Sequence, residues 1–185
     1  HVPHIHAASI GYETAGADPL ETEIGPDWVR NTRRHRDIEP SALVRAWGDF
    51  PGRIDRSSVS RWTPPANVSI ELTMNDATRR ITARIDHLVT PATDGTTHYW
   101  FFWTRDFARD DAAMDDLVVR GNRQVAEEDI AMIEAQAEMI ALQPEARAVP
   151  VRADRGLAAA QRILDRAAAA EAGVTKPGST RHRRR

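Results

Sequence analysis

Three consecutive runs of the chain alternate between apolar and polar side chains, and this alternation is the strongest constraint on the fold. The runs cover residues 68–74, 81–89 and 96–107, and turn-forming residues at 75–76 and 91–95 separate them. A period of two places successive side chains on opposite faces of a strand, so the runs predict an antiparallel meander of three strands. The third run carries bulky side chains on both faces, and we therefore expect it at the centre of the sheet.

A helical pattern follows the predicted meander. Apolar residues recur at three- and four-residue steps after Asp110 and Asp111, which are acidic residues that suit a helix start, and Pro144 marks the end of this helix. A second, alanine-rich helix is predicted over residues 154–172. Strands followed by long helices indicate an α+β fold in which the helices pack on one face of the antiparallel sheet.

The segment before the meander shows no such periodicity. Residues 16–65 are rich in proline, glycine and arginine, and they predict loops with one short helix at residues 41–47. A chain of 185 residues is long enough to bury a core as one domain. We expect this domain to cover residues 1–173, followed by a disordered basic tail at residues 174–185.

The composition excludes several classes of site and partner. The chain has no cysteine, so it cannot itself supply a disulfide, a cysteine-bound metal or a thiol nucleophile. Its net charge of -2 offers no electrostatic basis for binding nucleic acid or an anionic membrane, and a DNA-binding role would rest on residues 181–185 of the tail alone. No apolar run approaches the roughly 18 residues of a membrane span, and we expect a soluble cytoplasmic protein.

Three histidines lie within the first six residues, at His1, His4 and His6. They could be surface or tag-derived imidazoles, or they could belong to a metal site. On a regular helix His1 and His6 would point about 140° apart, whereas His1 and His4 would lie closer together. Pro3 favours an extended conformation for the residue before it, so the spacing leaves the choice of pair open.

Five segments of the chain resemble one known family. The aromatic stretch THYWFFWTRDFARDD, which begins at Thr97, is similar to the T-H-Y-F-W-G-x-x-R-N-F-x-x-D-D-P motif of the vanillate O-demethylase and dicamba demethylase group of Rieske non-heme iron oxygenases. The other segments that resemble this family are HVPHIHAASIG, RIDRSSVSRWTPPANV, ARIDHLVTP and AEEDIAMIEAQAEMI. Each match is weak alone, but all of them occur in the family's order and extend across nearly the whole chain.

The resemblance implies a helix-grip (START/Bet v 1-like) domain, an antiparallel β-sheet packed with long C-terminal helices, that binds a mononuclear Fe(II) through two histidines and one carboxylate. Carried over residue by residue, the implied ligands are His1, His6 and Asp110, and His4 is not a ligand. Asp111 would then cap the helix, and the choice between Asp110 and Asp111 as the ligand stays open. Either carboxylate would be favoured in its ionised form near the helix N-terminus.

The resemblance also points to a substrate pocket. Phe101 corresponds to a position that the family places against the substrate, where relatives often have tryptophan. His87, His98 and Asn67 are further candidates for lining this pocket. The alternative is that these strand residues belong to a packed core.

For the intact protein the resemblance implies the oxygenase subunit of an aromatic monooxygenase, which uses O2 to demethylate a methoxylated aromatic acid such as vanillate. Electrons would come from NAD(P)H through a ferredoxin or flavin reductase component and a Rieske [2Fe-2S] cluster, within a homotrimer. That cluster needs two cysteines and two histidines, which the family carries in an N-terminal domain. We therefore expect this chain to be a truncated fragment that is inactive alone. The alternative function is a metal-free START-like module that binds a small ligand.

Overall fold

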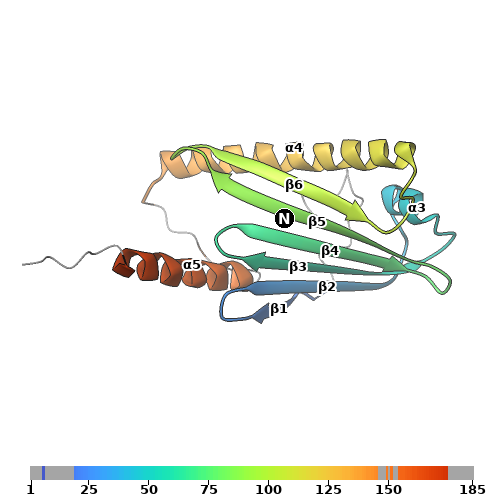
Figure 1. Ribbon diagram of the computed structural model, residues 1–185, viewed down its shortest axis with the longest axis horizontal. Coiled ribbons are helices and arrows are strands. Elements are labelled where there is room, and N and C mark those ends of the chain that lie inside the picture. Colours follow the sequence, from blue (N-terminus) through green and yellow to red (C-terminus); the bar gives the residue numbers. More distant parts are fainter. Residues whose placement is uncertain (1–5, 7–18, 146–148, 150, 152–153, 175–185) are drawn as a thin grey trace, which may run out of the picture.

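The computed structural model describes residues 6, 19–145, 149, 151 and 154–174. It forms a six-stranded sheet in which each strand pairs antiparallel with its neighbour in the sequence, in the order β1 to β6 (Figure 1). The elements are β1 (Glu21–Ile24), β2 (Val29–Ile38), α3 (Ala42–Gly48), β3 (Ile54–Thr63), β4 (Asn67–Asn75), β5 (Arg80–Pro91), β6 (Thr97–Arg105), α4 (Ala112–Leu142) and α5 (Arg155–Val174).

The predicted α+β, helix-grip fold class is confirmed, because long helices follow a purely antiparallel sheet and pack on it. The three alternating runs form β4, β5 and β6, and the predicted helices form α3, α4 and α5. Among the described residues, no helix is both long and apolar enough to cross a membrane. His1 and His4 lie outside the described residues, and so does the predicted tail except for residue 174, which belongs to α5.

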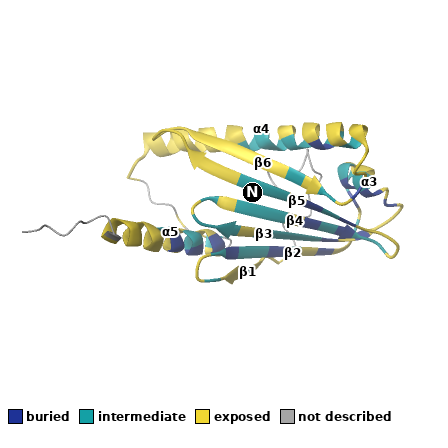
Figure 2. Ribbon diagram, in the orientation of Figure 1, coloured by how far each residue is buried: buried dark blue, intermediate teal, exposed yellow. Residues whose placement is uncertain are grey.

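The main core lies at the end of the sheet where α3 and the start of α4 cover it. Strand residues Leu72, Met74, Ile81 and Ala83 are buried there, and Val44 of α3 packs against the same cluster. These strand side chains alternate with exposed or half-buried ones, as the two-residue period requires. Figure 2 shows that buried residues gather at this end, whereas the far ends of β5, β6 and α4 are exposed. A second, smaller cluster places Ala159 and Ile163 of α5 against Val29 of β2.

The prediction of loops over residues 16–65 is wrong for most of that segment, because β1, β2 and β3 lie within it. Two of these strands lack a clear alternation of apolar and polar residues in the sequence, because they bury polar side chains at positions where an apolar residue is expected. Thr32 and His35 of β2 are each 3% exposed, and Arg56 of β3 is 8% exposed. Thr32 and His35 are three residues apart and therefore lie on opposite faces of β2, and His35 pairs with Arg56. Buried positions occupied by such polar residues do not give the apolar alternation from which a strand is recognised.

The expectation that the third run lies at the centre of the sheet is also wrong. Among the described strands β6 pairs only with β5, so it is an edge strand. Trp100 and Phe102 remain 58% and 55% exposed on one of its faces. Bulk on both faces of a strand therefore did not mean burial on both faces.

The start of α4 confirms the capping role expected of an acid at this position. Asp111 adopts an extended conformation, and its Oδ1 accepts hydrogen bonds from the backbone N–H groups of Ala113 and Met114 at 2.9 and 3.1 Å. These bonds satisfy amides that the first turn of a helix leaves without helical partners. Asp110 is exposed one residue earlier.

We predict that Asp111→Ala lowers the free energy of unfolding by about 1 kcal/mol, because it removes the N-cap of α4. Urea denaturation followed by circular dichroism measures the change. Asp110→Ala is the matched control and should change the free energy of unfolding by less than about 0.5 kcal/mol, as is usual for exposed side chains. Equal losses from the two variants would contradict the assignment of the cap.

Candidate functional site

One buried histidine lies between two acids of α4. His6 is 3% exposed, its Nδ1 lies 2.7 Å from Oε2 of Glu128, and its Nε2 lies 3.1 Å from Oδ1 of Asp129. The amide of Gln124, one turn earlier on α4, donates to the other oxygen of Glu128 at 3.3 Å. A buried imidazole thus has a carboxylate at each ring nitrogen.

The contact between His6 and Asp129 fits a shared metal ion. Imidazole nitrogens and carboxylate oxygens bind first-row metals at about 2.1 Å, and two such atoms at right angles around one ion lie about 3 Å apart. The 3.1 Å between Nε2 and Oδ1 matches this separation. No group of three or more candidate ligands is assembled within the described part of the chain, which does not include His1. His6 and Asp129 therefore supply two donors of the kind that a two-histidine, one-carboxylate iron centre requires.

The structure does not bring Asp110 to this place. Asp110 precedes α4, whereas Asp129 lies in the second half of the helix. At a rise of about 1.5 Å per residue, the distance along α4 from Ala112 to Asp129 is about 26 Å. An exposed carboxylate at that distance cannot share an ion with His6. The acid that does reach His6 belongs to the segment AEEDIAMIEAQ, which resembles the family but was interpreted only as a helix.

A second histidine and a tyrosine lie near Asp129. The rings of His87 on β5 and Tyr99 on β6 stack with centroids 5.8 Å apart, and Nδ1 of His87 is hydrogen-bonded to the Tyr99 hydroxyl. Burial lowers the pKa of His87 and raises the pKa of Tyr99, and the negative charge of Asp129 shifts both pKa values upward. Nε2 of His87 is buried and has no hydrogen-bond partner among the described residues. Tyr99 was not among the predicted pocket residues. Its contact with His87 depends on the pairing of β5 with β6, which the sequence motifs do not specify.

The predicted pocket residues separate onto two faces of the sheet. His87 and Phe101 are register partners on the face that also carries Ile85 and Trp103. Because side chains alternate along a strand, His98 on β6 lies on the opposite face. Asn67 pairs with Leu88, which is next to His87 in the chain and so also belongs to the opposite face.

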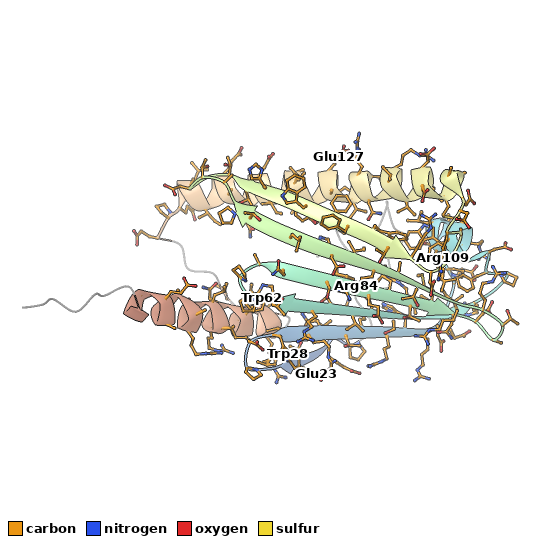
Figure 3. The ribbon with its side chains drawn as sticks, in the orientation of Figure 1. Glu23, Trp28, Trp62, Arg84, Arg109 and Glu127 are labelled. Carbon is orange, nitrogen blue, oxygen red and sulfur yellow. The ribbon has the colours of Figure 1, made fainter. Side chains whose placement is uncertain are left out.

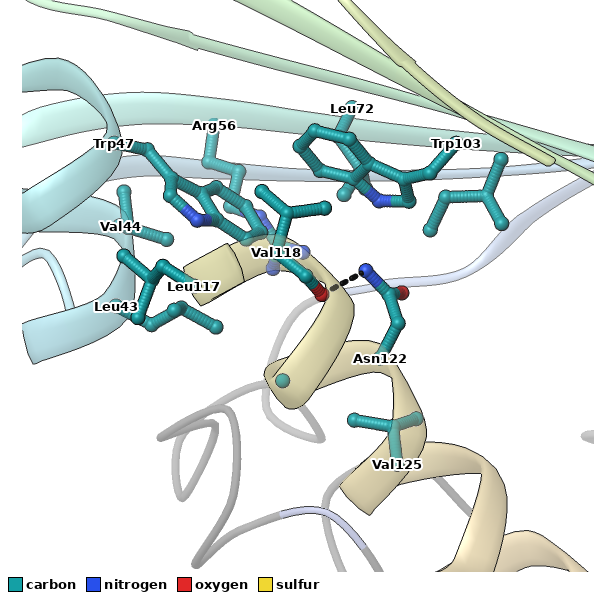
Figure 4. Close-up of a pocket in the computed structure, with 12 residues that line it drawn as sticks. Leu43, Val44, Trp47, Arg56, Leu72, Trp103, Leu117, Val118, Asn122 and Val125 are labelled. Atoms are coloured by element: carbon teal, nitrogen blue, oxygen red, sulfur yellow. Dashed lines mark hydrogen bonds between the residues drawn. The ribbon is translucent and has the colours of Figure 1, made fainter. Parts of the chain in front are cut away.

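An apolar cavity of about 90 Å³ lies between α3, the sheet and α4 (Figure 4). It is lined by Leu43, Val44, Trp47, Arg56, Leu72, Ile85, Trp103, Leu117, Val118, Gly121, Asn122 and Val125. The rings of Trp47 and Trp103 lie 5.3 Å apart at its wall. None of the four predicted pocket residues lines it.

The α4 wall of the cavity continues toward His6. Gly121, Val125 and Glu128 follow one another at steps of four and three residues, which places them on one face of the helix. From Val125 to Asp129 the rise along the axis is only about 6 Å. The cavity and the acids around His6 are therefore adjacent parts of one site.

Comparison with known proteins places this chain in a family. The family model for the vanillate O-demethylase oxygenase C-terminal domain matches residues 1–170. The toluene-4-sulfonate monooxygenase system iron-sulfur subunit TsaM1 of Comamonas testosteroni is 30% identical over 96% of this chain and 55% of its own length. The vanillate O-demethylase oxygenase subunit of Pseudomonas sp. (strain ATCC 19151) is 28% identical over 92% of this chain and 56% of its own length.

Solved structures show the same fold. A crystal structure of dicamba monooxygenase bound to dicamba superimposes with a TM-score of 0.77 and 21% identity, over 94% of this chain and 52% of that one. This chain spans about half the length of the curated relatives it matches. With the family model matched along residues 1–170, the chain belongs to the vanillate O-demethylase oxygenase C-terminal domain family.

Proposed function

We propose that this chain is the catalytic part of the oxygenase component of a Rieske-type aromatic monooxygenase. The reaction that we propose is O-demethylation of a methoxylated aromatic acid, similar to vanillate, with O2 at a mononuclear Fe(II). Membership of the vanillate O-demethylase oxygenase family supports the reaction class. The observation that carries the proposal is the buried His6 with Asp129 at 3.1 Å, next to an apolar cavity.

The proposed iron ligands are His1, His6 and Asp129, with Asp129 in place of Asp110. Two imidazoles and one carboxylate leave open coordination positions and suit iron that reacts with dioxygen. Such a centre, when loaded, supplies dioxygen activation. The contribution of the protein is to hold His6 in a dry environment beside Asp129 and to orient the substrate toward them.

The apolar cavity is the proposed place for the aromatic ring of the substrate. Its volume of about 90 Å³ is smaller than the roughly 150 Å³ of a cavity that holds benzene, so the ring would also occupy space toward His6. His87 is a proposed hydrogen-bond donor to the substrate, because its buried Nε2 lies on the sheet face that carries the cavity residues Ile85 and Trp103. Phe101 is its register partner and a proposed neighbour of the substrate.

The electron supply is proposed to lie outside these 185 residues. A Rieske [2Fe-2S] cluster requires two cysteines, and the chain has none. The proposed donor is NAD(P)H through a ferredoxin or flavin reductase component, in a cytoplasmic homotrimer.

A metal-free module for a small apolar ligand is the second candidate, and the cavity walled by Trp47 and Trp103 favours it. A binding module of that kind has no use for a buried imidazole between two carboxylates. Fe(II) binding therefore discriminates between the two candidates.

We predict that Asp129→Asn abolishes stoichiometric Fe(II) binding by the purified protein, because it removes the charged ligand opposite Nε2 of His6. Anaerobic Fe(II) titration against a chelator measures the affinity. Asp110→Asn is the matched control and should retain the affinity within about twofold. Loss of iron from the Asp110 variant but not from the Asp129 variant would instead identify Asp110 as the carboxylate ligand.

We predict that Gly121→Leu weakens binding of vanillate by about tenfold or more, which corresponds to about 1.4 kcal/mol. A Cβ at Gly121 meets only Leu43 Cδ2, at 3.9 Å, so a larger side chain would grow into the cavity. Fluorescence of Trp47 and Trp103 follows the titration. Gly121→Ala is the control, because alanine adds one methyl group and stabilises the helix by about 1 kcal/mol. Unchanged affinity in the leucine variant would place the substrate elsewhere.

We predict that His87 titrates below its ordinary pKa of 6.5, because burial disfavours its charged form. Between the lowered pKa and 6.5 the unfolded chain binds more protons than the folded one, so the free energy of unfolding decreases as the pH falls through this range. NMR titration of the imidazole resonances measures the pKa directly. His87→Gln should reduce the slope of stability against pH, and a slope equal to that of the wild type would contradict this assignment.

A further inference from the structure

We propose that Glu128 is a positioning residue of the metal centre, whose carboxylate accepts the Nδ1–H of His6 and so presents Nε2 to Asp129. The inference rests on the proposed function, because it assigns a role within the same site. It concerns a residue that does not itself bind the metal. Its basis is the difference between the two carboxylate contacts of one imidazole.

The two distances assign different roles to the two acids. The 2.7 Å between Nδ1 and Glu128 is typical of a charge-assisted hydrogen bond, whereas the 3.1 Å between Nε2 and Asp129 matches two atoms that share an ion. A neutral imidazole has one N–H donor and one lone pair. A carboxylate that accepts from Nδ1 therefore leaves the lone pair on Nε2, which is the form that binds a metal.

Helix geometry explains why two consecutive residues can take these separate roles. Residues 128 and 129 of α4 point about 100° apart, so their side chains reach the ring from different sides. Glutamate is also one methylene longer than aspartate, and it reaches the nitrogen on the far side of the ring from Asp129.

The orientation of Glu128 is itself held by the helix. Gln124 donates its amide to Oε1 of Glu128 at 3.3 Å, which leaves Oε2 for His6. The two residues are four apart on α4 and therefore adjacent on its surface. The contacts run in series from Gln124 through Glu128 to His6, and these hydrogen bonds hold the ring.

The test measures Fe(II) affinity and the visible spectrum of the Co(II)-substituted protein in variants of Glu128. Removal of such a partner typically weakens metal binding by about 10- to 100-fold, and we expect this loss for Glu128→Ala. The Co(II) bands should shift, because the ring is no longer fixed. Glu128→Gln keeps an acceptor oxygen without the charge, and we expect wild-type Co(II) bands with an affinity between those of Glu128→Ala and Glu127→Ala.

The matched control is Glu127→Ala. Glu127 is exposed, and Figure 3 shows it on the outer side of α4, pointing away from the sheet. Its removal changes the net charge equally and should leave both the affinity and the spectrum unchanged. If Glu128→Ala does not fold, Glu128→Gln decides, because the loss of a charged partner still predicts an affinity below that of the Glu127 variant.

The outcomes separate this inference from the proposed function. Affinity and spectrum in both Glu128 variants equal to those of Glu127→Ala would overturn the positioning role. If Asp129→Asn also keeps its iron, the proposed metal centre itself fails. If Asp129→Asn loses iron and both Glu128 variants keep it, the proposed metal centre is supported and the positioning role of Glu128 is contradicted.

Discussion

A single face of α4 packs on the sheet, and both the cavity and the candidate metal centre depend on that contact. Val118 of this face is 5% exposed, and with Gly121 and Val125 it forms a wall of the cavity. Glu128 and Asp129 follow one turn later, where the cover over the sheet becomes incomplete. Beyond them the helix is exposed, with Ile133 at 64% and Ile140 at 62%. The site therefore lies at the boundary between a dry core and an open end.

The position of His6 at this boundary has an energetic reason. A buried imidazole is costly unless its nitrogens find partners. Glu128 is the partner of Nδ1, and Nε2 faces Asp129 at the position proposed for the metal. The acids remain partly exposed, at 25% and 32%, so their own charges are not fully desolvated. The charge of Asp129 also acts on His87 and Tyr99 across the gap to the sheet, which joins the three groups into one electrostatic environment.

Much of the fold could be predicted from periodicity. The alternating runs and the three- and four-residue steps identified β4, β5, β6, α4 and α5, because apolar burial on one face is a local pattern. Periodicity did not identify β2 and β3, since both strands bury polar side chains, at Thr32, His35 and Arg56. The edge position of β6 could not be predicted from periodicity either, because the number of neighbours of a strand depends on the whole sheet.

For the site, the short motifs identified the family and predicted His6 as a metal ligand. It could not identify the acid that His6 meets. The motifs pointed to Asp110 or Asp111 as the acid, but about 26 Å of α4 lies between Ala112, at its start, and Asp129. Only the tertiary structure shows that residues more than a hundred positions apart in the chain, His6 with Glu128 and Asp129, come together. Contacts between residues so far apart in the sequence depend on how helices and strands pack against one another. A local sequence pattern does not contain this information.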